Sequence, residues 1–121
     1  MDLKSFLKEN NSLPENRRVC ISPCFRDGDG AAEWELRAVT EEEYRRAAEN
    51  AKDKWAALCV LAAVTPDLRD KGLWESYGTA SAEDTLKEML YPGEYLRLLE
   101  EVKALNGFAE RRAAWKEQAK N

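Results

Sequence analysis

Hydrophobic side chains recur every three or four positions through most of the chain that follows residue 40. Thr40 and Glu43 have the spacing of a capping box, which begins a helix. The helical spacing then continues over residues 44–64 and ends in an apolar run from Ala56 to Val64. Because this run is apolar on nearly all sides, it predicts a helical segment buried at the centre of the fold.

Two shorter elements are expected after this helix. Thr65 and Pro66 have the arrangement of an N-cap and a first helical residue, so another helix is expected to begin there. Glycines then bracket residues 73–77, a short segment that carries a tryptophan and a tyrosine. These signals predict two short pieces of helix rather than one long one.

The helical spacing returns in the last third of the chain. Ser81 is placed to cap a helix over residues 82–90, and Pro92 is placed to open the next one. Asn106-Gly107 favours the left-handed conformation that closes a helix. A final helix is expected over residues 108–120.

The first 40 residues show a different pattern. Asp2 is a possible N-cap for a short helix within residues 1–11. Residues 19–25 and 34–38 then form two apolar or alternating runs around an Asp-Gly-Asp-Gly turn at 27–30, which predicts a β-hairpin. Pro23 cannot donate to a ladder, so the first strand should lie at an edge or bulge there.

Together these elements predict one domain over residues 1–121. Its fold class is mainly α, or α+β, with about five helices and a short N-terminal β-hairpin. Residues 1–40 contribute the N-terminal helix and the hairpin, and residues 41–121 contribute the helical body.

Composition narrows the class of protein. The 121 residues are 44% hydrophobic and 35% charged, with a net charge of −4. The longest apolar run is about half of what a membrane span needs, and the start does not have the pattern of a signal peptide. The cytoplasm is therefore the expected location, and no membrane partner is expected.

Catalytic, cofactor and metal sites are not expected. The sequence has no histidine, which removes the commonest general base and metal ligand. Cys20 and Cys24 have a possible zinc spacing, but only Cys59 remains as a further soft ligand. The acidic turn at 27–30 lacks the later ligands of an EF-hand. Three cysteines in a chain without a secretory signal are expected to be reduced thiols.

Basic residues concentrate at the end of the chain. Residues 103–121 carry a net charge of +3 and residues 1–102 carry −7. A basic helix can contact nucleic acid, but the acidic body would repel phosphate. Lys and Arg near the end of the last helix are also favoured by the helix dipole. Nucleic acid is therefore not the expected partner.

Aromatic side chains give the one candidate binding surface. They gather around helix ends marked by Gly and Pro, where they fit either core packing between helices or a partner-binding surface. The spacing does not separate the two interpretations. The candidate partner-binding residues are Trp74, Tyr77, Tyr91 and Tyr95.

A family resemblance covers nearly the whole chain. Its clearest part runs from Leu90 to Tyr95 and continues in Asn106-Gly107-Phe108. It also includes Thr65-Pro66-Asp67-Leu68, Leu73 to Gly78, Ala82-Glu83-Asp84, Phe6-Leu7, Phe25-Arg26-Asp27 and Trp34-Glu35-Leu36. On these residues the sequence resembles the XkdN-like phage tail assembly chaperones of tailed phages and PBSX-like prophages.

The resemblance implies a non-enzymatic role in phage tail assembly. Members of that family bind the tape measure protein, keep it soluble, help recruit the tail tube protein, and are absent from the finished virion. It leaves open whether the chain is a monomer or a homo-oligomer, and which surface holds the partner. The alternative interpretation is a small cytoplasmic adaptor or regulatory helical domain with a nucleic-acid partner.

Overall fold

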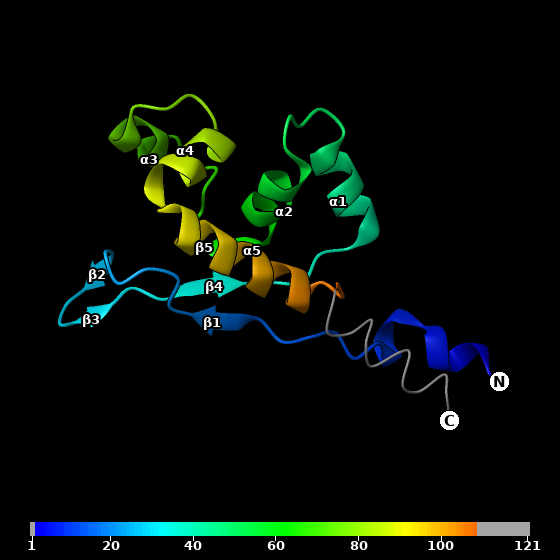
Figure 1. Ribbon diagram of the computed structural model, residues 1–121. Coiled ribbons are helices and arrows are strands. Elements are labelled where there is room, and N and C mark those ends of the chain that lie inside the picture. The colour runs from blue at the N-terminus through cyan, green and yellow to red at the C-terminus, as the bar shows by residue number, and fades with distance from the viewer. Residues whose placement is uncertain (1, 109–121) are drawn as a thin grey trace.

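The computed structural model describes residues 2–108 as five α-helices packed on a small antiparallel sheet (Figure 1). The sheet has the strand order β1-β4-β5, where β1 is Arg17–Val19, β4 is Trp34–Leu36 and β5 is Ala63–Thr65. This arrangement confirms the predicted fold class, which is helical with a small N-terminal β-structure.

The N-terminal hairpin is present, with its strands shifted from the predicted ranges. Strand β1 pairs with β4 in the register Val19 opposite Trp34, and β2 (Arg26–Asp27) pairs with β3 (Gly30–Ala31) at the tip. Gly28 has a φ of 64° in the tip turn, a conformation that favours glycine. Pro23 lies between the strands, and β1 is an edge strand.

The single helix expected over residues 41–64 is wrong. The chain forms α1 (Glu41–Ala48) and α2 (Lys54–Ala62), separated by a short loop. The Asp53 side chain accepts hydrogen bonds from the backbone N–H groups of Trp55 and Ala56, so it begins a new helix. The expected end of that helix instead forms β5, where Ala63 pairs with Leu36 and Thr65 pairs with Glu35 of β4.

A helix beginning at Pro66 is also wrong. The Thr65–Pro66 peptide bond is cis and follows β5 directly. The next helix, α3 (Lys71–Tyr77), begins after Asp70, whose carboxylate accepts from the Gly72 backbone N–H. Gly78 ends α3 with a φ of 66°.

The helices of the last third follow the sequence closely. Helix α4 spans Ala82–Met89 and is capped by Ser81, and α5 spans Pro92–Leu105. Gly107 has the predicted left-handed backbone, with a φ of 89°. The helix expected over 108–120 lies outside the described residues beyond Phe108.

The N-terminus forms two short 3₁₀ helices, Leu3–Phe6 and Lys8–Asn10, where one short helix is expected. Asp2 does cap the first turn, where its carboxylate accepts from the Lys4 backbone N–H at 3.2 Å. The segment has no buried residue, so no tertiary contact supports a longer helix.

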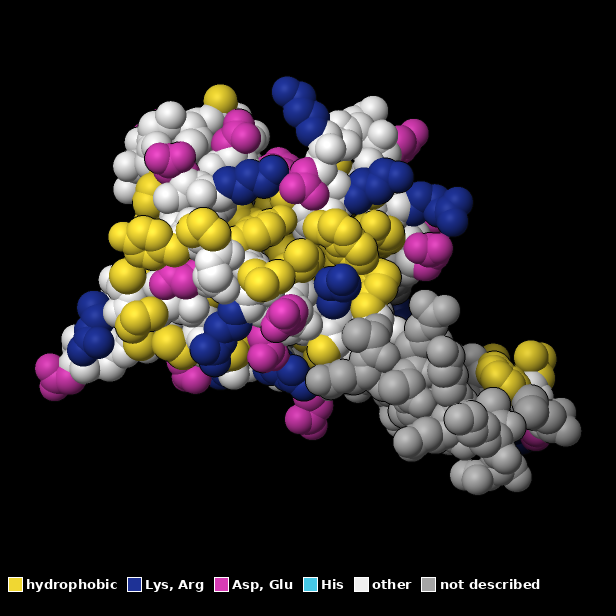
Figure 2. Space-filling view, in the orientation of Figure 1, with side chains coloured by type: hydrophobic (Ala, Val, Ile, Leu, Met, Phe, Trp, Pro, Cys, Tyr) yellow, Lys and Arg dark blue, Asp and Glu magenta, His cyan; other side chains and the backbone are white. Residues whose placement is uncertain are grey.

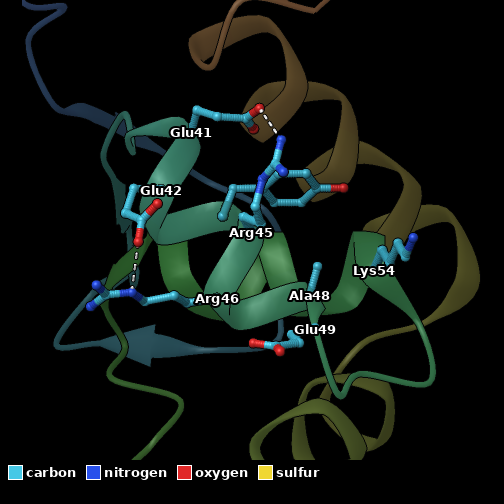
Figure 3. A pocket seen from close by; sticks show the side chains of 8 residues that line it. Glu41, Glu42, Arg45, Arg46, Ala48, Glu49 and Lys54 are labelled. Atoms are coloured by element: carbon cyan, nitrogen blue, oxygen red, sulfur yellow. Dashed lines mark hydrogen bonds and ion pairs between the residues drawn. The ribbon is translucent and has the colours of Figure 1, made fainter.

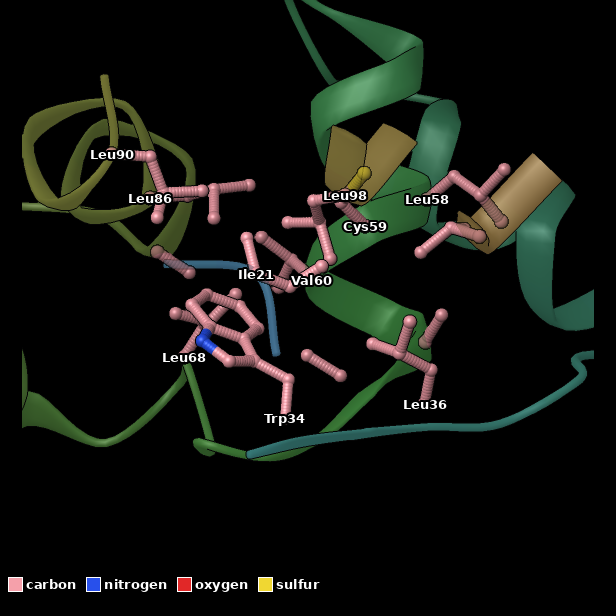
Figure 4. Packing of buried hydrophobic residues seen from close by; sticks show 14 of the residues in the cluster. Ile21, Trp34, Leu36, Leu58, Cys59, Val60, Leu68, Leu86, Leu90 and Leu98 are labelled. Carbon is pink, nitrogen blue, oxygen red and sulfur yellow. The ribbon is translucent and has the colours of Figure 1, made fainter. Parts of the chain in front are cut away.

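The core surrounds α2, as its apolar sequence predicts. Helix α2 contacts α1, α4, α5 and β5, and Leu58 and Cys59 are almost completely buried. Figure 4 shows Trp34 and Leu36 from the sheet in one cluster with Val60 of α2 and Leu86 of α4. The core thus joins the hairpin to the helices in one unit.

Candidate functional site

Helix α2 separates two apolar surfaces of the molecule. With a rotation of about 100° per residue, Trp55 and Cys59 lie on one side of the helix, and Ala57 and Leu61 lie on the opposite side. The first side is covered by α5 and its continuation to Phe108. The second side forms part of a groove with α1, α3 and α4.

The first surface, which we call the α5 face, contains large apolar side chains beside the core. Tyr91 is 69% exposed and Leu96 is 55% exposed, while Tyr95 and Leu99 are half-buried against the core. Figure 2 shows hydrophobic side chains gathered in a band over and beside α5, with charged side chains along its margins. The six residues of this face are Trp55, Tyr91, Tyr95, Leu96, Leu99 and Phe108.

Aromatic contacts hold the α2 end of this face in place. The rings of Trp55 and Phe108 meet edge to face, with their centroids 5.2 Å apart. The Lys103 ammonium lies 4.5 Å from the centroid of a Trp55 ring, within the range of a cation–π contact. The Trp55 ring of α2 is therefore held against Lys103 of α5 and Phe108 just beyond that helix.

Tyr95 combines burial with a polar end. Burial, followed by the nearby Cys59 and Asp53 groups, raises the pKa of its hydroxyl to about 12. The phenol therefore stays neutral at physiological pH and offers an O–H donor on an apolar surface.

The second surface is a groove of about 340 Å³ between α1, α2 and the α3–α4 pair, which we call the Trp74 groove. Its apolar lining consists of Ala47, Ala57, Val60, Leu61, Trp74 and Ala82, and its polar lining consists of Arg69, Ser81 and Glu83. The Trp74 indole N–H donates to the Leu68 carbonyl oxygen at 2.6 Å, which fixes the ring in the wall.

A third hollow lies beside α1 and carries charges (Figure 3). Glu41 pairs with Arg45 at 3.3 Å, and Glu42 pairs with Arg46 at 3.0 Å, each one helical turn apart. These four side chains are mostly exposed, so the pairs stabilise the helix by only a few tenths of a kcal/mol each. Within residues 2–108, no group of three His, Cys, Asp or Glu is arranged to hold a metal ion.

Comparison with known proteins identifies the family. The model of the phage XkdN-like tail assembly chaperone proteins matches residues 50–120, which include α2 to α5 and therefore most of both apolar surfaces. The chain belongs to this family. Membership indicates a chaperone role in phage tail assembly.

A solved structure supports the fold of this tail assembly chaperone. The crystal structure of the protein yqbn is 26% identical in sequence and superposes with a TM-score of 0.81, covering 90% of this chain and 98% of that one. No curated protein matches the chain. No helix in the described part of the chaperone is long and apolar enough to span a membrane.

The structure distributes the four predicted aromatic residues of the chaperone over different places. Tyr91 and Tyr95 lie on the α5 face, Trp74 lines the groove on the other side of α2, and Tyr77 is half-buried at the end of α3. Sequence reasoning missed Leu96, because its helical spacing alone did not distinguish an exposed position from the core positions beside it.

Proposed function

We propose that this chaperone binds the tape measure protein through the α5 face, keeps it from aggregating, and helps bring the tail tube protein to it. It acts in the host cytoplasm and is not part of the finished virion. Family membership carries the assignment to tail assembly. The exposed apolar side chains of α5 supply a surface suited to the client.

The chemistry of the α5 face suits an amphipathic helix. Tyr91 and Leu96 offer exposed apolar area, and half-buried Tyr95 and Leu99 form a firm base beneath it. Helices dock on such surfaces through apolar side chains spaced three or four residues apart. When the client helix docks, its apolar side chains are removed from solvent. An exposed apolar surface of that kind is what makes an unassembled helical protein aggregate.

Charged residues of α5 lie along the margins of the α5 face. Arg97 and Glu100 are exposed on the same helix, and Lys103 lies over Trp55 at its far end. Both signs of charge therefore border the apolar strip, as at the polar rim of many interfaces. We expect the client helix to carry an apolar strip flanked by charged residues.

A binding experiment with a matched control tests this assignment. The purified chaperone and its Leu96→Ser variant would be compared for capture of a soluble helical fragment of the tape measure protein. We expect Leu96→Ser to weaken capture by at least about tenfold, as loss of an interface anchor does. Val64→Ser is the control, since Val64 is 40% exposed on β5 rather than α5. Equal capture by all three proteins would contradict the use of the α5 face.

A further inference from the structure

The exposed apolar side chains of α5 lie next to the place where a further segment of the chain begins. Toward the start of α5, Tyr91 is 69% exposed and Leu96 is 55% exposed. Phe108, the last described residue, lies at the other end of the α5 face, where its ring meets Trp55 edge to face at 5.2 Å. Residue 109 therefore begins at one end of the surface to which we assign the client.

The end of α5 turns the chain off the helix axis. The Phe108 backbone N–H donates to the Lys103 carbonyl oxygen at 2.9 Å, and the Gly107 N–H lies 3.4 Å from the Ala104 carbonyl oxygen. Together with the φ of 89° at Gly107, these contacts form a Schellman motif. Helices joined by so short a turn pack antiparallel. The turn therefore favours a return of the next segment along α5.

The sequence that follows has a basic, aromatic side and an acidic side. At about 100° per residue, a helix of the kind expected over residues 108–120 brings Trp115 to the side of Phe108. The Arg111-Arg112 pair falls on that same side, between the two rings. Glu110 and Glu117 both fall on the opposite side. The side that continues from Phe108 is therefore the one suited to an acidic surface with apolar side chains.

Opposite charges favour docking of this segment on the rest of the protein. Residues 109–121 hold four basic and two acidic residues, whereas residues 1–108 carry a net charge of −6. Glu100 is exposed on α5, and Glu41 lines the hollow beside Phe108. Carboxylates are thus available to the basic side of the segment at the margins of the α5 face, which is the complementarity that specific contacts use.

The length of the segment also suits the α5 face. As a helix, the 13 residues 109–121 span about 20 Å, and the 14 residues of α5 span about 21 Å. Trp115 lies seven residues after Phe108, which is about 10 Å along a helix. In an antiparallel arrangement this distance brings the Trp115 ring level with the part of α5 that carries Leu96 and Leu99.

We propose that residues 109–121 fold back along α5 and cover the α5 face with Trp115, and that the client displaces this cover. The regulatory role rests on the proposed function, whereas the cover itself does not. A cover docked in about two thirds of the molecules lowers the apparent affinity for the client about threefold, because only the open form binds. It also shields apolar side chains while no client is present.

Hydroxyl-radical footprinting of the full chain, read by peptide mass spectrometry, measures the cover without a client. We expect Trp115→Ser to raise the oxidation rate of Leu96 about threefold, since the open form then dominates. Leu13 is the internal control, because it is 69% exposed in the N-terminal segment and its rate should not change. Circular dichroism and thermal melting verify that the variant is folded.

A charge variant gives a second measurement of the same contact. Arg111→Glu combined with Arg112→Glu reverses the charge on the side that faces α5, and it should raise the oxidation rate of Leu96 as Trp115→Ser does. Glu117→Gln is the matched control, because position 117 falls on the opposite side of the expected helix. It should leave the oxidation rate of Leu96 at the wild-type value.

Capture of the tape measure fragment then tests the regulatory role. Trp115→Ser should bind the fragment about threefold more tightly than the wild-type chain, because its face is no longer covered. Leu96→Ser in the Trp115→Ser background measures the client contact in the absence of its competitor. A loss of capture there supports the α5 face as the client site independently of the cover.

Two results would overturn the proposal. One is an oxidation rate of Leu96 that neither Trp115→Ser nor the paired arginine changes raise. The other is weaker client capture by Trp115→Ser, which would make the segment part of the client site. If no variant captures the client although Trp115→Ser exposes Leu96, the proposed function fails and the footprint still supports the cover.

Discussion

Asn106 joins α5 to the segment between β4 and α1, and its removal gives the sharpest test of how the fold is held together. Its side-chain oxygen accepts from the Val39 backbone N–H at 2.6 Å. Its side-chain amide donates to the Val102 carbonyl at 3.0 Å and to the Arg37 carbonyl at 3.4 Å. One side chain thus connects the end of α5 to the segment between β4 and α1, which lies far away in sequence.

Replacing Asn106 with alanine should cost about 2 kcal/mol of unfolding free energy. A typical net hydrogen bond contributes about 1 kcal/mol, and a partly buried N–H left without a partner costs about 1–3 kcal/mol. The short contact to Val39 accounts for most of this, because the 3.4 Å contact to Arg37 is long for a hydrogen bond. For a domain of this size, the loss corresponds to a fall in Tm of about 8 °C.

Urea unfolding followed by tryptophan fluorescence measures the loss. The slope of free energy against urea should stay unchanged, because the surface exposed on unfolding is nearly the same. Asn106→Asp is the companion variant, since it keeps an oxygen acceptor for Val39 but turns a second acceptor oxygen toward the Val102 and Arg37 carbonyl oxygens. We expect Asn106→Asp to lose at least as much stability as Asn106→Ala. A loss below about 0.5 kcal/mol for the alanine variant would refute the role given to this side chain.

Three further predictions concern charge, reactivity and packing. The pKa of Glu43 is lowered from 4.5 to about 2, and the hydrogen bond from Arg37 is the largest cause. The ionised Glu43 carboxylate should therefore stabilise the fold above pH 4.5, and this stabilisation should disappear as the pH falls toward 2. The difference in Tm between the wild-type chain and Glu43→Gln should therefore shrink over that range, and a constant difference would contradict the ion pair. Burial raises the pKa of Cys59 to about 12, so a thiol reagent at neutral pH should modify exposed Cys24 in the folded protein and Cys59 only after unfolding. Leu98→Ala at a fully buried position should cost about 2–5 kcal/mol, whereas Leu96→Ala on the same helix should cost less than about 0.5 kcal/mol, as measured by urea unfolding.

The sequence predicted those elements whose signals are local. The Thr40–Glu43 capping box, the Ser81 cap and the left-handed Gly107 all depend on residues within one turn of each other, and all three are present. The hairpin was predicted for the same reason, from a turn flanked by alternating residues. The central position of α2 followed from its apolar run, which no exposed helix would carry.

The features that were missed depend on contacts between distant parts of the chain. Ala63 and Val64 end an apolar run, and only the pairing of Ala63 and Thr65 with β4 makes Ala63–Thr65 a strand. The loop before Asp53 separates α1 from α2, but the hydrophobic residues on both sides of it keep the same helical spacing. Periodicity alone therefore predicted one helix. At the candidate site, the gathering of aromatic residues around helix ends grouped Tyr91 and Tyr95 with Trp74, and it did not show that α2 would separate them.

Co-expression with the tape measure protein of the same phage or prophage tests the central claim most directly. The measurement is the fraction of tape measure protein that stays soluble and co-purifies, with and without the chaperone. We predict a large gain in soluble, co-purifying tape measure protein with the wild-type chain and a much smaller gain with Leu96→Ser. Tape measure protein that aggregates equally in the presence and absence of the chain would contradict the proposed function.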